Sequence, residues 1–310
     1  MKWIKRGRIF EPKGQTGWMK KYGILPTPYY IEEKNIIRIF FGTSAEDNVC
    51  KITFVDVHAD NPSEVLYLHT RPLLEEGEKG LFDEHGLNPS QLLYFNHQFW
   101  LFYIGYQRLQ TVPYLLFASY AQLNGSLDGV VTRKRTPVLE RTDTEPFIRS
   151  ALTIVPDGNL FHIWYVSAYK WEWMNTNVFK NKLLPNYHIR YCTTKDFKAF
   201  EVYPFPVIEA KDDDEFGFGR PWCIKDGGIF KMWYSIRRRH ISYHIGYAES
   251  SDGIHWERKD DEVNFDVSES SWDSEMICYP AVIKVKNKTY LFYNGNNNGS
   301  TGFGYAELEE

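Results

Sequence analysis

The sequence has 310 residues, of which 43% are hydrophobic and 17% are Phe, Trp or Tyr, a composition that favours strands over helices. The net charge of −4 argues against a general nucleic-acid-binding protein. No apolar run is long enough for a membrane-spanning helix, and the first residues lack an apolar signal-peptide core. The four cysteines form no CxxC pair, so we expect reduced thiols in a cytoplasmic protein, with no disulfide framework and no structural zinc.

One aromatic segment recurs five times along the chain, at intervals of about 60 residues. Its copies are IIRIFFGTS (36–44), FWLFYIGYQ (99–107), LFHIWYVSA (160–168), IFKMWYSIR (229–237) and TYLFYNGNN (289–297). Each copy alternates between residue classes with period two, which is typical of a strand. The sequence therefore consists of five similar units, each with this segment at its centre.

Further strand-like runs flank each copy. A shorter run with a proline or small residue near its start precedes it, at 23–31, 86–95, 148–156, 219–227 and 278–285. A third run follows it, at 50–57, 114–122, 187–194, 242–250 and 302–308. The first four units add a fourth run, at 64–74, 133–140, 199–208 and 255–265. Five units of four antiparallel strands predict an all-β fold, a five-bladed β-propeller.

The fifth unit ends at residue 310 without a fourth run, and residues 2–10 resemble the missing outer strand. We therefore predict that the N-terminal strand closes the ring, which removes an open sheet edge, and that residues 1–310 form a single domain. A β-sandwich or two all-β domains are the alternatives, but sandwiches do not repeat at this period. Met174–Leu184 has no clean apolar stripe and is interpreted as an insertion in the third unit.

Five repeats, prolines at the first strands, aromatic second strands and the segment Ser250–Trp256 (SSDGIHW) resemble the five-bladed glycosidase superfold. That group includes arabinanase/xylosidase-like, invertase-like and mannoside-phosphorylase-like enzymes. The resemblance implies a central funnel, lined by the starts of the first strands, where the catalytic carboxylates of those families lie. The sequence departs from the family pattern in its first unit, where Leu25-Pro26-Thr27-Pro28 replaces the usual Asp-Pro. This departure puts the standard hydrolytic mechanism in doubt.

Strand geometry indicates which residues surround the funnel. The first strand of a unit starts on the face where its antiparallel second strand ends, and concave mouths are the default binding sites. Glu145, Asp273 and Glu275 approach this mouth and are the predicted catalytic groups, because glycoside hydrolysis uses two opposed carboxyl groups. The alternative is that they form structural ion pairs with arginines.

Arginines are also frequent at the predicted mouth. Arg149, Arg220 and Arg237 suggest an anionic sugar, because guanidinium groups bind carboxylate and phosphate in a bidentate manner; for Arg237 a solvated loop is the alternative. Cys223 is the one cysteine expected near the funnel. The other predicted substrate-binding residues are His85, Asn88, Trp171, Trp222, Tyr279 and Asn294. We expect no metal and no cofactor.

Three functions are compatible with this pattern. The first is a glycoside hydrolase or phosphorylase-like enzyme that acts on an anionic or phosphorylated sugar in the funnel. The second is a non-catalytic propeller that binds a sugar or nucleotide sugar in surface-polysaccharide biosynthesis. The third is a protein-interaction scaffold, because fold alone does not fix function; the polar mouth counts against it. The expected partner is a carbohydrate or sugar-phosphate ligand, with no nucleic acid and no membrane insertion.

Overall fold

The computed structural model describes residues 1–309, and its regular secondary structure is almost entirely β-strand. The strands are β1 (Trp3–Phe10), β2 (Lys21–Ile31), β3 (Ile36–Ser44), β4 (Lys51–His58), β5 (Asn61–Leu68), β6 (Leu87–Phe95), β7 (Gln98–Arg108), β8 (Tyr114–Leu123), β9 (Val130–Arg133), β10 (Ile148–Asp157), β11 (Leu160–Met174), β12 (Lys182–Thr194), β13 (Glu201–Val202), β14 (Glu215–Asp226), β15 (Ile229–Arg238), β16 (His244–Ser250), β17 (Glu257–Arg258), β18 (Cys278–Val285), β19 (Lys288–Asn294) and β20 (Phe303–Leu308). Two 3-10 turns (Glu32–Lys34, Asp260–Glu262) and the short α1 (Asn296–Gly299) complete the elements.

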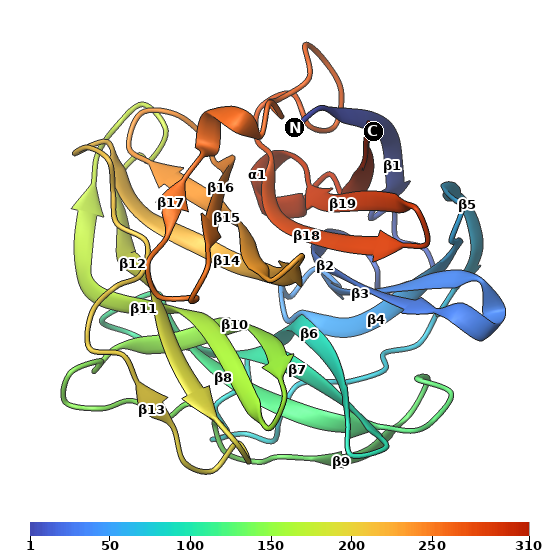
Figure 1. Ribbon diagram of the computed structural model, residues 1–310, viewed down its shortest axis with the longest axis horizontal. Helices are drawn as coiled ribbons and strands as arrows, with labels where there is room; N and C mark the ends of the chain where they lie inside the picture. The colour runs from blue at the N-terminus through green and yellow to red at the C-terminus, as the bar shows by residue number, and fades with distance from the viewer. Residues whose placement is uncertain (310) are drawn as a thin grey trace.

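Consecutive strands pair in antiparallel sets of four. The first set is β2 to β5, the second β6 to β9, the third β10 to β13 and the fourth β14 to β17, while β18, β19 and β20 pair in order with β1 as the fifth. Two single parallel bridges, Phe117–Arg149 and Tyr187–Gly217, join the second, third and fourth sets into one sheet. Figure 1 shows the first strands of the sets nearest the centre and the fourth strands at the periphery.

The N-terminal strand pairs as predicted. β1 lies antiparallel to β20, with Trp3 opposite Leu308 and Phe10 opposite Phe303. Phe10 also contacts Phe41 of the first set, with ring centroids 4.4 Å apart, and β18 lies against β2. The first and last sets are therefore in direct contact, although they lie at opposite ends of the chain.

The core lies between neighbouring sets because alternate residues of a strand point to opposite faces. In β11, Ile163 and Tyr165 are buried in the cluster shared with the second set, whereas Trp164 is buried in the cluster shared with the fourth. Fourth strands are shorter than predicted. β9 ends where the predicted run 133–140 begins, and β13 and β17 have two residues each.

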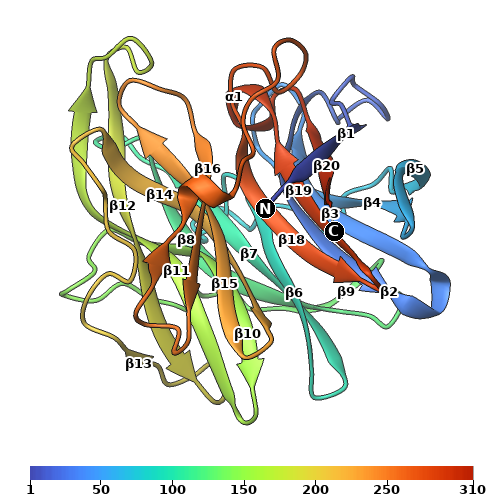
Figure 2. The same ribbon diagram turned by 45° about the horizontal axis from the view of Figure 1, so that its top comes forward.

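The predicted insertion at 174–184 is an extension of strands. β11 and β12 continue their pairing from Lys170 opposite Asn186 to Met174 opposite Lys182, and this hairpin extension, residues 169–186, is called the arm below. It rises at the upper left of Figure 2.

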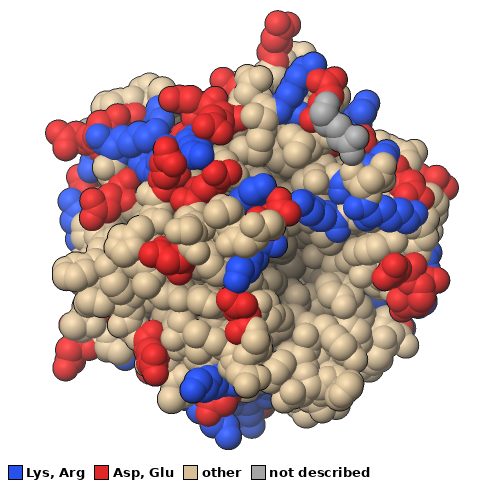
Figure 3. All heavy atoms as spheres, in the orientation of Figure 1, with Lys and Arg blue, Asp and Glu red and all other residues tan. Residues whose placement is uncertain are grey.

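All four cysteines are free, and among residues 1–309 there is no helix of the length and apolarity that a membrane crossing needs. On the face seen in Figure 3, Lys and Arg side chains lie among Asp and Glu side chains around a central hollow.

Candidate functional site

A pocket of about 440 Å³ receives residues from all five sets. The first strand of each set supplies wall residues, among them Leu25, Asn88, Ala151, Arg220 and Tyr279. This is the central site that the repeat predicts, and five of the predicted ligand-binding residues line it: His85, Asn88, Arg220, Arg237 and Tyr279.

A recurring backbone irregularity aims the first-strand residues at the pocket. Leu25, Ala151, Arg220 and Tyr279 have positive φ angles of 59°, 50°, 38° and 55°. Each lies in a register shift between its strand and the second strand of its set. A bulge of this kind bends the strand and re-aims a side chain. Positive φ at a non-glycine residue costs of the order of 1–3 kcal/mol and is concentrated at functional sites, so this strain makes the pocket the candidate functional site.

The third strands supply a second group of wall residues that the sequence reasoning missed. Cys50, Tyr114 and Tyr243 stand at or just before the starts of β4, β8 and β16, and Tyr187 is the first residue of β12 beyond the arm. All four line the pocket. The signal was present in the repeat, because a tyrosine stands at or next to the start of three of the five third runs. Third strands start on the same face as first strands, which makes their initial residues part of the mouth. Cys50, and not the buried core residue Cys223, is therefore the cysteine at the pocket.

Arg220 is 2% exposed and reaches from the fourth set to the first. Its Nη1 donates to the carbonyls of Pro26 (2.8 Å) and Tyr279 (3.0 Å), and its Nη2 donates to Thr27 Oγ1 (2.8 Å). Its Nε is buried without a hydrogen-bond partner. Burial lowers the pKa of Arg220 to about 9, so the side chain is still a cation at neutral pH, held at the centre of the molecule.

Arg237 is 3% exposed and supplies a second buried cation from the end of β15. Its Nε donates to Tyr243 Oη (2.7 Å), its Nη1 donates to the Pro185 carbonyl (2.6 Å), and its guanidinium lies 4.8 Å from the ring centroid of Tyr187. The alternative of a solvated loop is therefore wrong for this residue. Among residues 1–309, no carboxylate forms an ion pair with Arg220 or Arg237, and the described wall contains neither Asp nor Glu.

Apart from the exposed cation Arg108 and the histidine His85, the remaining polar wall groups are neutral. Burial raises the pKa values of Tyr187 and Tyr279 well above 10, so both hydroxyls stay protonated, and the Tyr187 hydroxyl is buried without a hydrogen-bond partner. Burial also raises the pKa of the Cys50 thiol to about 12, which removes it as a nucleophile because the thiolate is the reactive form. His85 is the one histidine of the described pocket wall. Its Nδ1 lies 3.6 Å from Glu84 Oε1 and accepts from the Arg108 backbone N–H at 3.3 Å.

Glu145 lies outside the pocket, in a buried cluster with a tyrosine and a cation. It accepts from Tyr165 Oη at 2.9 Å and lies 3.1 Å from Arg149 Nε. Arg149 also donates to the Glu140 carbonyl at 2.6 Å, so it points away from the pocket, where Ala151 takes the wall position of β10. Glu145 and Arg149 were predicted to face the central mouth, but they lie outside the pocket because they form an ion pair with each other.

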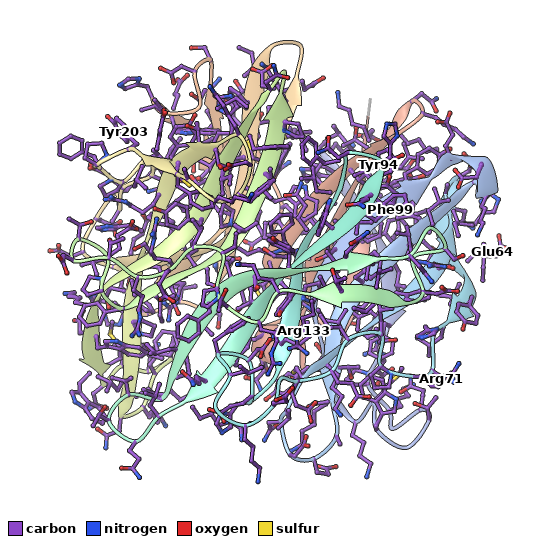
Figure 4. The ribbon with its side chains drawn as sticks, turned by 90° about the horizontal axis from the view of Figure 1, so that it is seen from below. Glu64, Arg71, Tyr94, Phe99, Arg133 and Tyr203 are labelled. Atoms are coloured by element: carbon purple, nitrogen blue, oxygen red, sulfur yellow. The ribbon has the colours of Figure 1, made fainter. Side chains whose placement is uncertain are left out.

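Asp273 belongs to an equivalent cluster in the fifth set. It accepts from Tyr293 Oη at 2.9 Å and from Lys5 Nζ at 2.6 Å. The second set has the cluster Asp83, Tyr103 and Arg133, and the fourth has Asp260, Tyr234 and Arg258. Arg133, at the end of β9, is labelled in Figure 4, which shows the molecule from below. We call these four groups the tyrosine–acid clusters. They recur with the repeat, which is typical of a structural role.

The other predicted residues lie outside the described pocket wall. Glu275 is an exposed loop residue whose backbone N–H donates to Asn296 Oδ1. Trp222 is buried in the core and donates from Nε1 to the Val282 carbonyl at 2.7 Å. Asn294 is fully buried, and its Oδ1 accepts from the Leu25 N–H at 2.8 Å, so it positions a wall residue. Trp171 packs edge-on against the wall residue Tyr114, with centroids 5.8 Å apart.

Solved structures confirm the resemblance to the five-bladed glycosidase superfold. A protein described as "Glycoside hydrolase" is 17% identical, with a TM-score of 0.69 over 99% of this chain and 92% of that one. A glycosyl hydrolase from Bacteroides ovatus is 12% identical, with a TM-score of 0.74 over 99% and 94%. A structure from work on the GH130 family of mannoside phosphorylases is 12% identical, with a TM-score of 0.73 over the same shares. At these identities the likeness establishes the fold alone.

No family model matches the sequence. A relative in Mycobacterium tuberculosis strain H37Rv, described as "Uncharacterized protein Rv1502", is 30% identical over 311 residues, which cover 100% of both chains. A protein of strain CDC 1551, described as "Uncharacterized protein MT1551", matches to the same extent. Because the identity extends over the whole length, the chain belongs to the same family as the mycobacterial protein Rv1502.

Proposed function

We propose that the chain is a five-bladed β-propeller, closed by the pairing of β1 with β20, that binds a sugar with an anionic group in its central pocket. The carrying observation is the pair Arg220 and Arg237, both buried in the pocket wall without a carboxylate partner among residues 1–309. A buried charge without a counter-charge costs several kcal/mol. A carboxylate or phosphate on the ligand would offset that cost, and guanidinium groups bind both through paired hydrogen bonds.

The tyrosines support the sugar part of the ligand. Six of them line the pocket: Tyr22, Tyr106, Tyr114, Tyr187, Tyr243 and Tyr279. Tyrosine combines an apolar ring with a hydroxyl that donates and accepts hydrogen bonds, which suits a ligand with both C–H faces and hydroxyl groups. The fold shared with glycoside hydrolases agrees with a carbohydrate ligand. We also propose a cytoplasmic location, which the four free thiols support.

Binding fits the pocket better than two-carboxylate hydrolysis does, because the described wall contains no acid, whereas hydrolysis uses a pair of carboxyl groups. A phosphorolytic enzyme is the second candidate, and His85 on the wall favours it. Phosphate held by the arginines would attack the anomeric carbon, the glycosidic bond would break, and the leaving oxygen would take a proton from the imidazole. Release of a sugar 1-phosphate in the presence of phosphate, lost in His85→Ala, would identify this activity.

The test of the binding proposal is calorimetric titration with galacturonic acid and mannose 6-phosphate and with their neutral counterparts, galactose and mannose. We expect Arg237→Gln to weaken binding of the acidic sugars by about 30-fold or more, because a buried charge partner is removed. Arg238→Gln is the matched control, since Arg238 is the next residue in the strand, lies outside the pocket wall and is 3.6 Å from Glu215. Thermal unfolding of each variant checks that the fold is intact. The proposal would be overturned if the neutral sugars bound the wild type as tightly as the acidic sugars do, and if Arg237→Gln left both affinities unchanged.

A further inference from the structure

The arm beside the pocket is fixed in place by one of its two faces. Arg239 donates from Nη1 to Glu172 Oε1 at 2.8 Å and from Nη2 to Glu172 Oε2 at 3.2 Å. The next residue on this face, Met174, is 2% exposed and its sulfur contacts the same guanidinium at 2.9 Å. Glu172 and Met174 thus attach the arm to the fourth set, and the structure accounts for both side chains.

The other face of the arm continues the pocket wall. Trp171 and Trp173 alternate with Glu172 and Met174 along β11, so they point to the opposite face. Trp171 packs on Tyr114, which lines the pocket. Trp173 lies two residues farther out on the same face and is 69% exposed, the most exposed of the large hydrophobic side chains described. A wall of aromatic rings therefore leads from the pocket out along the arm.

Two features of the surroundings indicate what this wall contacts. Arg108 at the end of β7, Pro113 in the β7–β8 connection and Tyr114 at the start of β8 line the pocket. The same connection exposes Leu109. The arm carries the exposed Lys180 and Lys182 at its far end, and Lys182 is paired with Met174, so it lies on the face opposite to Trp173. An exposed indole that extends an aromatic pocket wall indicates a binding surface. The ammonium groups at the far end of the arm add positive potential to this part of the molecule, which favours an anionic chain.

We propose that the arm is an outer subsite, in which Trp173 stacks on a further sugar ring of an acidic oligosaccharide whose first unit occupies the pocket. This inference rests on the proposed function and extends it, because it makes the ligand a chain of several sugars. Trp171 and Tyr114 form the passage between pocket and subsite, so the chain leaves along the face of the arm opposite to Glu172.

The test is a titration with galacturonic acid and its dimer, trimer and tetramer. We expect wild-type affinity to increase with chain length, and Trp173→Ala to weaken the tetramer about tenfold while leaving the monomer unchanged. Phe205→Ala is the matched control, because Phe205 belongs to the same set and is 63% exposed; we expect it to have no effect at any length. Equal wild-type affinity for monomer and tetramer, or tetramer binding that is unaffected by Trp173→Ala, overturns the outer subsite.

The Arg237→Gln variant separates this inference from the proposal on which it rests. If Arg237→Gln weakens every length but Trp173→Ala weakens none, the pocket stands and the subsite fails. If wild type binds neither monomer nor tetramer, the proposal of an acidic sugar in the pocket fails, and the subsite fails with it.

Discussion

The tyrosine–acid clusters and the central pocket differ in whether a cation has a carboxylate partner. In each cluster a carboxylate accepts a hydrogen bond from a second-strand tyrosine and lies against a cation, as Glu145 does with Tyr165 and Arg149. In the pocket, Arg220 and Arg237 are equally buried but contact carbonyls, hydroxyls and aromatic rings. The comparison teaches that burial alone does not distinguish the cations of the clusters from those of the candidate site. The absence of a counter-charge among the described residues distinguishes them.

The clusters follow from the repeat. The tyrosines of the four clusters each lie five residues after the first residue of their strand: Tyr103, Tyr165, Tyr234 and Tyr293. In the first set the same position holds Phe41, which packs on Phe10 and Phe303 with centroids 4.4 and 5.1 Å away. The set that meets the N-terminal strand thus has an apolar contact where the other sets have a hydrogen-bonded acid.

The largest expected effect comes from neutralising a cluster acid. Glu145→Gln leaves Arg149 and the nearby Arg190 buried without a counter-charge, and removal of one partner from a buried ion pair costs about 3–5 kcal/mol. We therefore expect the free energy of unfolding in urea to fall by that amount. Arg237→Gln is buried to the same degree but removes an uncompensated charge, so its loss should be smaller.

Glu275→Gln is the control for this measurement. Its side chain is exposed, and substitutions at such positions usually change stability by less than about 0.5 kcal/mol. If Glu145→Gln were as stable as Glu275→Gln, the clusters would not be structural ion pairs, and Glu145 would return as a candidate for catalysis.

A smaller effect is expected when the cluster tyrosine is placed in the one set that lacks it. Phe41→Tyr adds a hydroxyl among Phe10, Phe303 and other fully buried side chains. A buried hydroxyl without a partner costs about 1–3 kcal/mol, and we expect a loss of this size in urea unfolding. Tyr165→Phe provides the comparison, since it removes a hydroxyl that has partners. An unchanged stability of Phe41→Tyr would show that the first set can accommodate the hydroxyl without loss.

The repeat in the sequence predicts the strand order because every unit has the same period-two pattern and nearly the same spacing. It also predicts which strand ends surround the pocket, and therefore Asn88, Arg220 and Tyr279. Single residues within a first strand are harder to predict. Arg149 and Ala151 are two residues apart, and the bulge, which the residue pattern does not reveal, decides which of them reaches the pocket.

Charge pairing was the second feature beyond reach of the sequence. Glu145 and Asp273 precede first strands, as an acid at the mouth would, but their partners Tyr165 and Tyr293 lie 20 residues later in each case. Each acid meets its tyrosine only in the folded structure. Arg237 is the opposite case, a residue that lines the pocket although its surroundings in the sequence argue against it. It stands in a run of three arginines that resembles a solvated loop, and of these three only Arg237 lines the described pocket.

The smallest expected effect concerns the ion pair that attaches the arm. Hydrogen bonds from Arg239, followed by those from Lys170 and Asn186, lower the pKa of Glu172 to about 2, from an ordinary value of about 4.3. Because the folded-state pKa is depressed, the pair stabilises the arm above about pH 4.3, and that contribution is lost as pH falls through about 2. A partly exposed pair contributes about 1 kcal/mol or less, so we expect the arm to loosen at pH 2. Amide hydrogen exchange of residues 170–186 at pH 4.5 and 2, corrected for intrinsic rates, measures this change, and Glu172→Gln should remove it.

Two results would show that other contacts attach the arm: protection that is equal at both pH values, or a pH dependence that persists in Glu172→Gln. The paired charge would then have no special part in placing Trp173.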